Sequence, residues 1–348
     1  MKNNSIITAN RVIYQKEIFP ELQQEFGHLT TKHEQLIQLL DLIDLNEVYP
    51  RRFWDSCFGR PKVNRHSFVI AFIAKILWNI PETKDLIEYL KVDRALRVIC
   101  MFDGRSKKVP SESSFSREFS ELSRLGIGEQ IHAYLIKEHC SIELYEHVSF
   151  DASSIEATEK AVKTDKKERT VEAQRSMTLA EILSDLPDQC NFGTKKNSNG
   201  KTYTWKGYKL HVVTNEYSIP LTSIVTSDSV HDSLCAVPLI RQTDQLVDAL
   251  YFLGDKGYDA TAIRTEITAF DKVPLIDFKN NRTGKPTGEF IGNQKERYNK
   301  RSFVEGVFST LKMSYLPRYI LYRGIKKVKT VLNIALSIIT GIQIIKYA

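Results

Sequence analysis

The sequence predicts a mixed α/β fold, in which a mixed sheet flanked by helices is preceded by an all-α N-terminal domain. Two observations predict it. From Glu21 to His139 apolar residues recur at helical spacing, whereas after Glu143 alternating segments rich in β-formers are interleaved with helical ones. The order strand, hairpin, helix, strand, helix, strand, helix is typical of a sheet with helices packed on it. We therefore expect two domains, residues 1–143 and residues 144–348.

Composition bounds the class of protein. The chain has 348 residues, which is long enough for two domains, and its 42% apolar and 26% charged content excludes wholesale disorder. The five cysteines are scattered, odd in number and form no CxxC pair, so a zinc ribbon and a disulfide framework are both disfavoured and a reducing compartment fits better. The first 17 residues contain no apolar core of the length that a secretory signal needs, so secretion is not expected.

The helices of the first domain can be placed individually. Residues 66–80, HSFVIAFIAKILWNI, are apolar nearly all round, which predicts a central helix ending before Pro81. Residues 82–99 have amphipathic spacing and predict a helix against the core. Residues 113–139 continue as helices with a break around Gly126–Gly128.

The second domain opens with strands. Residues 147–154, HVSFDASS, alternate and predict a strand that ends at Asp151. Residues 156–200 are polar and charged and predict an exposed insertion or mobile loop. Residues 203–215 and 218–227 predict two strands joined by a short turn at Glu216–Tyr217.

The rest of the second domain alternates. Helices are expected over 232–249, 261–270 and 296–315, and strands over 249–254 and 272–278, with a Gly- and Asn-rich loop at 279–294. Residues 331–345 are strongly apolar but too short for a membrane span, which needs about 20 residues. They also contain Asn333, Ser337, Thr340 and Gln343, so we expect a buried helix, packed on its own sheet or on a partner, and no membrane contact.

Positive charge is concentrated at the C-terminal end. The net charge is +7, and residues 272–348 carry 15 Lys and Arg against 4 Asp and Glu. A concentrated basic segment attracts polyanions, of which nucleic acid is the commonest large one. A basic surface that serves only solubility is the alternative.

Three acidic residues stand where chemistry is expected. Asp151 and Asp255 each follow a predicted strand, at the sheet end where ligands gather in open α/β folds, and Glu305 lies in the middle of a basic amphipathic helix. Carboxylates suit Mg²⁺, and two ions can stabilise both oxygens of a phosphodiester displacement. The alternative is that Asp151 and Asp255 are structural caps and Glu305 is a solvated helix residue.

The helix around Glu305 carries a further pattern. Tyr298, Arg301, Glu305 and Lys312 follow one another at steps of three, four and seven residues. On one continuous helix these steps put the four side chains on nearly the same face. Three of them are of types that contact phosphate and one is of a type that ligates metal, so we expect a surface helix with one chemical face.

These four positions form the pattern Y-x2-R-x3-E-x6-K, and the sequence here resembles the DDE transposases of bacterial insertion sequences, in the group named after those four letters. SFDASSIEA resembles the family's first-aspartate strand and FLGDKGYDA its second-aspartate segment, which implies those roles for Asp151 and Asp255, with Asp259 as the rival of Asp255. The segment VPSESSFSREF resembles part of the helical N-terminal domain of these transposases, and the resemblance covers roughly residues 60–345.

The resemblance implies a ribonuclease-H-like catalytic domain, which cuts a DNA strand at the transposon end and transfers the freed 3′-hydroxyl into target DNA. It implies that Asp151, Asp255 and Glu305 ligate two Mg²⁺ ions, for which Mn²⁺ can substitute, and that Tyr298, Arg301 and Lys312 hold phosphates. Residues 1–143 would bind the DNA ends. It also implies a homodimer on DNA and a location in the bacterial cytoplasm, at the nucleoid. Only about 20 residues separate Phe278 from Tyr298, so the large β insertion of relatives that form hairpin ends is not expected.

Other residues are secondary candidates. His231, followed by Asp232, could approach a phosphate or a metal, although a helix cap beside a structural histidine is the preferred interpretation. Lys206 and Lys209, next to aromatic residues, could line a DNA groove or lie on a strand surface. Arg323, in the family-like YRGIKKV segment, is a further candidate for DNA binding. A basic cluster in the first domain consists of Arg51, Arg52, Arg60, Lys62 and Arg65.

Two alternatives to a transposase stay open. One is a DNA-binding protein that kept the fold but lost recombination, and the other is a nuclease without strand transfer. Walker, GxGxxG and Cys/His metal motifs are all absent from the sequence.

Overall fold

The computed structural model describes residues 24, 29–50, 63–103, 109–140, 144–163, 167–196, 200–281 and 283–347. The chain falls into two compact units. The helical unit comprises Met1–Leu135, Leu311–Pro317 and Lys326–Ala348, and the sheet unit comprises Ile136–Thr310 and Arg318–Ile325. The expected boundary after residue 143 therefore does not describe the helical unit completely, because the C-terminal segments group with it.

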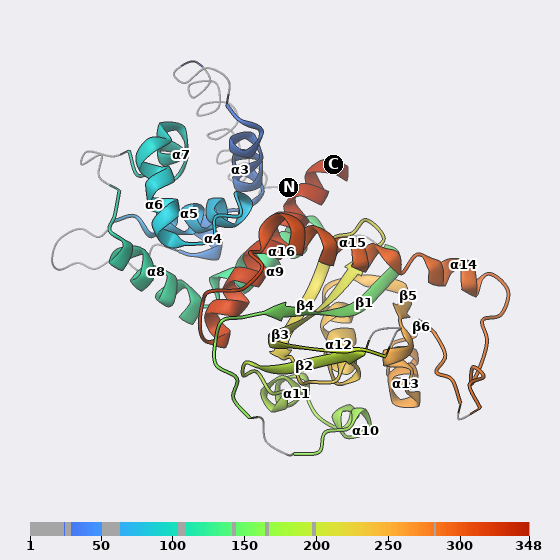
Figure 1. Ribbon diagram of the computed structural model, residues 1–348. Helices are drawn as coiled ribbons and strands as arrows, with labels where there is room; N and C mark the ends of the chain where they lie inside the picture. The colour runs from blue at the N-terminus through green and yellow to red at the C-terminus, as the bar shows by residue number, and fades with distance from the viewer. Residues whose placement is uncertain are drawn as a thin grey trace. The chain divides into compact units, whose positions relative to one another are not determined.

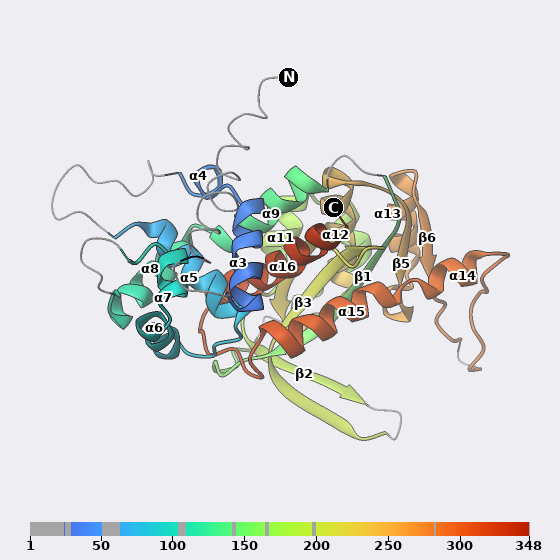
Figure 2. The same ribbon diagram turned by 90° about the horizontal axis from the view of Figure 1, so that it is seen from above.

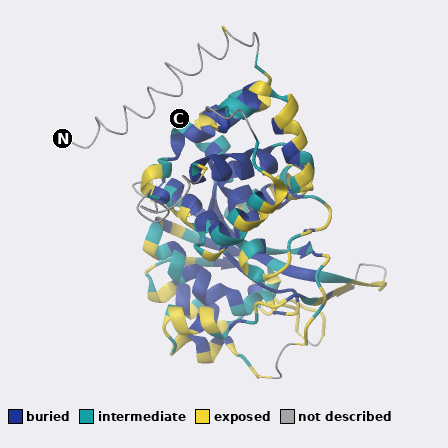
Figure 3. Ribbon diagram, turned by 90° about the vertical axis from the view of Figure 1, so that its left-hand side faces the viewer, coloured by how far each residue is buried: buried dark blue, intermediate teal, exposed yellow. Residues whose placement is uncertain are grey.

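In its described part the helical unit contains helices from both ends of the chain (Figure 1). They are α3 (Thr31–Leu42), α4 (Leu45–Val48), α5 (Arg65–Leu77), α6 (Thr83–Val92), α7 (Arg94–Ile99), α8 (Glu112–Arg124), α9 (Ile127–His139), the π-helix η5 (Leu311–Tyr315) and α16 (Ile325–Tyr347). Every residue of α5 is buried, which confirms the expected central helix. Its Phe68 and Phe72 rings contact Phe115 of α8, with centroids 4.9 and 5.8 Å apart. Buried residues, dark blue in Figure 3, run through both units.

Helix α16 is the expected apolar helix near the C-terminus. In the described part of the chain it alone is long and apolar enough to cross a membrane, but 72% of its most apolar stretch is buried inside the protein, as in a core helix. It packs closely on two earlier helices: a Cβ on Gly128 of α9 would lie 2.7 Å from the Thr330 carbonyl oxygen, and one on Gly341 would lie 2.3 Å from Leu39 of α3. Its packing partners thus include helices near the start of the chain.

The sheet unit is built on a mixed sheet, which confirms the predicted fold class. Its strands are β1 (Leu144–Glu156), β2 (Asn191–Lys196), β3 (Thr202–Asn215), β4 (Pro220–Ser227), β5 (Asp248–Gly254) and β6 (Val273–Ile276). Their order is β2-β3-β1-β5-β6, with β4 also paired to β3. Strands β1 to β4 pair antiparallel, whereas β5 runs parallel to β1 and β6 parallel to β5. The sheet is thus antiparallel on one side of β1 and parallel on the other.

Helices cover both faces of this sheet (Figure 1). Helix α12 (Ala236–Leu246) lies on the face where Thr222 of β4 contacts Thr243 across 3.1 Å, together with α13 (Thr261–Ala269). Helix α15 (Ser302–Thr310) packs on β1 and β3 from the other face, where the Ser149 hydroxyl donates to the Arg301 carbonyl. The remaining helices are α10 (Val171–Arg175), α11 (Leu179–Asp185), α14 (Gln294–Asn299) and the short 3₁₀ helices η3 (Asp232–Cys235) and η4 (Lys256–Tyr258).

The polar segment 156–200 is more ordered than an exposed loop. It contains α10, α11 and β2, and α10 contacts α12 and α13. Helix α11 begins with a capping box between Thr178 and Glu181, and the Gln174 amide of α10 donates to the Leu234 carbonyl. The segment looks loop-like in sequence because it is mostly charged and its elements are too short for a clear period.

Candidate active site

Asp151 lies in the middle of β1, which continues to Glu156 because it pairs with β3 that far, and does not end at Asp151 as the sequence predicts. It pairs in register with Val212 of β3, and its side chain is 21% exposed. Its pKa is raised to about 6: burial is the main cause and the negative charges of Asp255 and Asp232 add to it, while the Ala152 amide and Arg301 act in the opposite direction. Asp151 is therefore a partly desolvated carboxyl surrounded by other acids.

Asp255 directly follows β5, as the sequence predicts. Strand β5 runs parallel to β1 with Ser149 opposite Leu253, and continuing that register by two residues places Asp255 opposite Asp151. The Asp255 carboxylate accepts a 2.8 Å hydrogen bond from the Gly257 amide and so caps η4. The structural role expected in the alternative interpretation is thus present, but it does not move Asp255 away from Asp151.

The sequence analysis did not single out Asp277, which follows β6 in the same way. Gly254 of β5 pairs with Ile276, so the next step of the register places Asp277 opposite Asp255. Asp151, Asp255 and Asp277 therefore form a row across three neighbouring parallel strands, at the level where β5 and β6 end. A signal was present in the sequence, because Asp277 is the second-last residue of the predicted strand KVPLIDF, residues 272–278. Lys256 faces Asp277 at 3.7 Å.

Asp259, the alternative to Asp255, has a structural role. Asp259 accepts hydrogen bonds from the Arg264 guanidinium at 2.9 and 3.1 Å and from the Lys279 amide at 2.8 Å. These contacts tie the start of α13 to the segment after β6. Register and hydrogen bonding therefore both favour Asp255.

Arg301 connects the strand to the helix. Its guanidinium lies 3.3 Å from the Asp151 carboxylate and 2.5 Å from the Glu305 carboxylate. The Arg301 side chain is 19% exposed, whereas that of Glu305 is 56% exposed. Asp151 and Glu305, which are 154 positions apart in the sequence, are thus brought to one guanidinium.

Tyr298 lies beside this cluster on α14. Burial raises its pKa, and the charges of Asp277 and Asp255 also raise it, while Arg301 lowers it. Its ring packs against Phe290, with centroids 4.9 Å apart. The hydroxyl is therefore within the electrostatic reach of both aspartates and of Arg301.

The single helix expected over residues 296–315 is wrong in detail. The segment consists of α14, a turn at Lys300–Arg301, α15 and the π-helix η5. In the turn the Arg301 amide donates to the Tyr298 carbonyl, and the Val304 amide to that of Arg301, so three-residue bonds replace the α-helical ones. Tyr298, Arg301 and Glu305 consequently come from three different local structures rather than from one helical face.

Lys312 and Arg323 are exposed, but they lie in different parts of the fold. Lys312 is in η5, which groups with the helical unit. Arg323 belongs to the sheet unit, in a segment attached to the end of β1: Ile320 bridges to Ala157, and the Gly324 amide donates to Glu159 at 2.8 Å.

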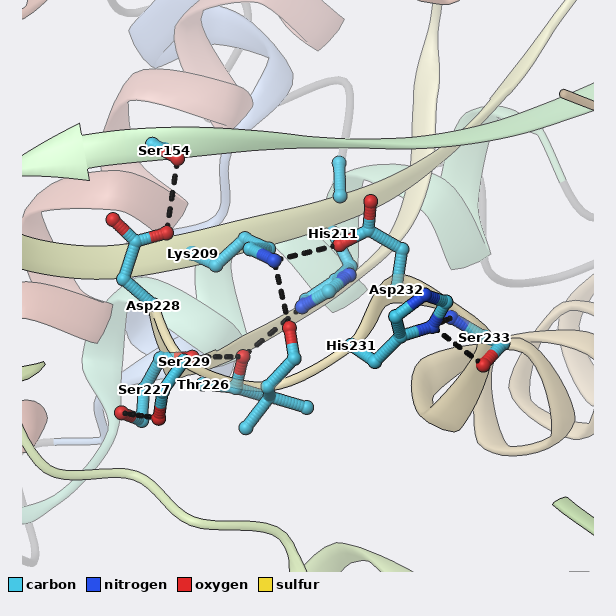
Figure 4. Close-up of polar contacts among 12 residues, drawn as sticks. Ser154, Lys209, His211, Thr226, Ser227, Asp228, Ser229, His231, Asp232 and Ser233 are labelled. Carbon is cyan, nitrogen blue, oxygen red and sulfur yellow. Dashed lines mark hydrogen bonds and ion pairs between the residues drawn. The ribbon is translucent and has the colours of Figure 1, made fainter. Parts of the chain in front are cut away.

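The His231–Asp232 segment forms a structural network (Figure 4). The His231 ring is the cap of η3, because its Nδ1 accepts from the Ser233 amide at 3.3 Å. The expected cap is therefore present, but the histidine itself provides it, rather than Asp232 or Ser233. Lys209 donates to the Val230 carbonyl at 2.7 Å and pairs with Asp232 at 2.8 Å.

These contacts decide between the two interpretations of the β3 lysines. The Lys209 side chain is only 17% exposed and is saturated by partners from the β4–η3 connection, so its role in lining a DNA groove is not supported. Lys206 is half-buried in the part of β3 that pairs with β2, opposite Phe192. It stays a candidate for DNA contact.

Most of the basic cluster of the first domain, Arg51, Arg52, Arg60 and Lys62, lies outside the described residues. Arg65 is described and is structural: it is 9% exposed, donates to the Tyr49 hydroxyl at 2.9 Å and pairs with Glu118 at 3.2 Å. A phosphate-binding role for Arg65 is therefore not supported.

The donor set suits a hard divalent cation, because Asp151, Asp255 and Glu305 offer only carboxylate oxygens. The charge of Asp255 raises the pKa of Asp151, and a cation between the two would relieve this repulsion. Among the described residues, however, no group of three or more His, Cys, Asp and Glu side chains is arranged to hold a metal ion. Arg301 is the positive group next to Asp151 and Glu305. The ligand assignment stays a prediction.

Comparisons with known proteins complete the description. Residues 143–339 match the family model described as "Transposase DDE domain", and residues 23–121 match the model "Transposase domain (DUF772)". No curated protein matches the chain. Among solved structures the chain is similar to the Mos1 transposase paired-end complex with left transposon end, at 12% identity over 88% of this chain and 94% of that one. The TM-score of 0.20 is too low to establish a shared fold.

Proposed function

Since the match to the Transposase DDE domain spans more than half of its residues, the chain belongs to that family, and we propose that it is a DNA transposase of the insertion-sequence group with the Tyr-Arg-Glu-Lys signature. It binds the terminal inverted repeats of its element, cuts a strand at each end and transfers the 3′-hydroxyl ends into target DNA. Membership of a DDE family implies phosphoryl-transfer chemistry with a divalent metal ion.

One observation carries this proposal. Arg301 contacts both Asp151 and Glu305, and the strand register places Asp255 next to Asp151. These two observations support a common site for the three acids, which lie far apart in the sequence. Structural caps alone would not require Glu305 to be joined to Asp151 through a guanidinium.

The proposal assigns metal binding to the three acids and phosphate binding to Arg301. Asp151, Asp255 and Glu305 would hold two Mg²⁺ ions, or Mn²⁺ in their place, and the ions supply charge stabilisation for the entering and leaving oxygens. Arg301 suits bidentate phosphate contact, so DNA can draw its guanidinium away from the two carboxylates.

The other phosphate contacts are assigned by position. Tyr298 would contact a phosphate next to Arg301, and Lys312, Arg323 and Lys206 would contact DNA outside the acidic cluster. Lys209 and His231 have no role in DNA binding or catalysis in this proposal, since their contacts are structural. The helical unit would bind the transposon ends.

Joining two ends requires two active sites, so we propose a homodimer on DNA. The activity belongs where its substrate is, at the nucleoid in the bacterial cytoplasm. The proposed dimer follows from the number of DNA ends to be joined, and the proposed location follows from where the substrate is.

The substitution Glu305→Gln tests the assignment. It removes a charge but keeps the shape, so we expect DNA binding close to wild type and complete loss of Mg²⁺-dependent cleavage and strand transfer. The substrate is linear duplex carrying the inverted repeats that border the gene, and gel electrophoresis resolves cut and joined products. Cleavage at the wild-type rate would remove Glu305 from the site.

The same assay separates the alternatives. Cutting without joining by the wild-type protein would indicate a nuclease. Binding without cutting would indicate a DNA-binding protein that has lost recombination. Glu266 of α13 offers a matched control. It is a buried glutamate paired with Arg175 and Arg241, so Glu266→Gln affects folding stability without changing the acidic cluster.

A further inference from the structure

Strand β2 and residues 202–207 of β3 form a two-stranded ribbon that extends from the sheet (Figure 2). The pairing runs from Asn191 opposite Gly207 to Lys196 opposite Thr202. Toward its tip the ribbon is exposed on both faces, including Thr194, Lys195, Thr202, Tyr203 and Thr204. An isolated two-stranded ribbon is at best marginally stable in water. Its exposed surface is therefore open to a partner, and its stability must come from its base.

The base of the ribbon is firmly attached. Asp228 is 2% exposed and accepts hydrogen bonds from the Ser154 hydroxyl of β1 at 2.9 Å, which Figure 4 shows, and from the Trp205 indole of the ribbon. A Cβ on Gly193 would lie 2.7 Å from the Asp228 carboxylate, and one on Gly207 would lie 2.0 Å from the Ile155 carbonyl oxygen. Both glycines thus permit a close approach that fixes the ribbon to the sheet.

The side chains of the ribbon suit binding to a polyanion. Residues 191–207 contain four lysines and no acidic residue. The Lys201 ammonium lies over the Tyr203 ring, 5.6 Å from its centroid, and the exposed threonines add hydroxyl donors. Basic side chains interleaved with aromatic and hydroxyl groups suit contact with a phosphate backbone.

The ribbon also extends the face of the sheet that carries Asp151. Val212 of β3 lies opposite Asp151, and alternate residues of a strand share a face, so Lys206, Thr204 and Thr202 continue the face that carries Asp151. From Val212 to Thr202 the strand advances about 33 Å at about 3.3 Å per residue, which is close to one helical turn of B-DNA. A two-stranded ribbon also fits the major groove.

We propose that the ribbon of β2 and residues 202–207 is a DNA-binding arm that contacts the phosphates of duplex DNA beyond the acidic cluster. The inference rests on the proposed function, because it assumes that the DNA at the cluster is the DNA that the ribbon holds. Its contacts are electrostatic and independent of sequence, so they can be measured on any duplex.

The test compares two double variants of the full chain, each lacking two lysines. Lys196→Gln with Lys206→Gln removes the two ribbon lysines that the strand pairing places on the Asp151 face, whereas Lys137→Gln with Lys167→Gln removes two exposed lysines elsewhere in the sheet unit. The probe is a fluorescent duplex of random sequence, about 30 base pairs or three helical turns long. Fluorescence anisotropy without divalent metal gives the binding constant over a series of salt concentrations.

Each phosphate contact contributes about 0.9 to the slope of log affinity against log salt. We expect the ribbon variant to bind more weakly than wild type and to lose about 1.8 from the slope, while the control keeps the wild-type slope. Equal slopes for wild type and ribbon variant, or equal losses in the two variants, would overturn the inference. A change in self-association in sedimentation at unchanged slope would assign the ribbon to a second copy of the chain and would also overturn it.

The two proposals fail in different ways. If the wild-type chain does not bind the duplex at all, the proposed function itself fails. If the wild type binds and cuts DNA and the ribbon variant binds equally well, only the proposal of a DNA-binding arm is contradicted.

Discussion

At the scale of single residues, Arg301 governs the charge of the candidate site. It lies 3.3 Å from Asp151 and 2.5 Å from Glu305, and it opposes the rise in the pKa of Asp151 that burial causes. A guanidinium shared by two carboxylates keeps them together without DNA. A phosphate offers Arg301 an alternative bidentate partner, and a cation offers the carboxylates another positive charge. The same residue can therefore stabilise the free protein and respond to substrate.

The raised pKa of Asp151 gives a prediction for folding stability. In the unfolded chain the carboxyl has its ordinary pKa of 3.8, whereas in the folded protein the value is about 6. A raised carboxyl pKa means that the folded state binds the proton more tightly. The stabilisation is therefore complete below pH about 4 and is lost as the pH rises through about 6. Asn at this position does not titrate.

We therefore expect Asp151→Asn to gain stability relative to wild type between pH about 4 and about 7, by up to about 3 kcal/mol. Urea unfolding with a chelator present, followed at several pH values, measures the difference. A stability difference that stays constant with pH would contradict the assignment.

How far single residues could be predicted depended on what surrounds them. Asp151, Asp255 and Glu305 could be found because each stands at a recognisable place in the sequence pattern. Asp277 follows a strand in the same way but is part of none of the motifs in the sequence, and the strand register places it beside Asp255. Lys209 and Arg65 have the residue type of a phosphate ligand, but their partners Asp232 and Glu118 lie 23 and 53 positions away, which local spacing cannot reveal.

At the scale of elements, two glycines of the sheet unit have opposite requirements. Gly207 pairs with Glu156 at the base of the ribbon, where a Cβ would lie 2.0 Å from the Ile155 carbonyl oxygen. Gly306 is exposed on α15, and a Cβ there would meet no atom within 4 Å. Glycine is needed at the first position and costs helix stability at the second.

We expect Gly207→Ala to destabilise the protein by about 1–3 kcal/mol, because the backbone of β1 must shift. Gly306→Ala should stabilise it by about 0.5–1 kcal/mol, since alanine loses less conformational freedom in a helix. Thermal unfolding of the two variants beside wild type measures both effects. Shifts of the same sign would show that the close approach at Gly207 does not constrain the strand.

The elements that sequence patterns predicted best were the long ones. The paired strands β3 and β4, the central helix α5 and the strand–helix alternation from β5 to β6 follow directly from periodicity. The break between α14 and α15 did not, because the apolar spacing continues through Lys300–Arg301 while the hydrogen bonding changes. Strand β2 was missed because its alternation is polar on both faces, as befits a ribbon without a core beneath it.

At the scale of the whole molecule, the helical unit is assembled from both ends of the chain. Helix α16 approaches α9 so closely that a Cβ on Gly128 would lie 2.7 Å from the Thr330 carbonyl oxygen and 2.9 Å from its Cα. The sequence indicated a buried helix at 331–345, but not what it packs on. Periodicity identifies an apolar face, and a partner from some 200 positions earlier leaves no mark in that pattern.

We expect Gly128→Val to loosen the helical unit selectively, because the backbone of α16 must move away. Limited proteolysis should then cut the described helices of that unit faster than wild type and leave the fragment containing β1 to β6 at its wild-type rate. Ala133→Val, at an exposed position of α9, is the control and should change neither rate. Equal acceleration of cutting in both units would argue against selective loosening.

The origin of this core in opposite ends of the polypeptide constrains how the protein is made. A nascent chain emerges from the ribosome N-terminus first, and the early helices must wait for α16, whose 23 residues are synthesised after all the other described helices. Translation that stops before residue 325 therefore yields a product whose early helices lack the surface that covers them. A prematurely terminated copy of this gene would release a chain that quality-control proteases can degrade, instead of a free-standing helical fragment that competes with the full-length protein.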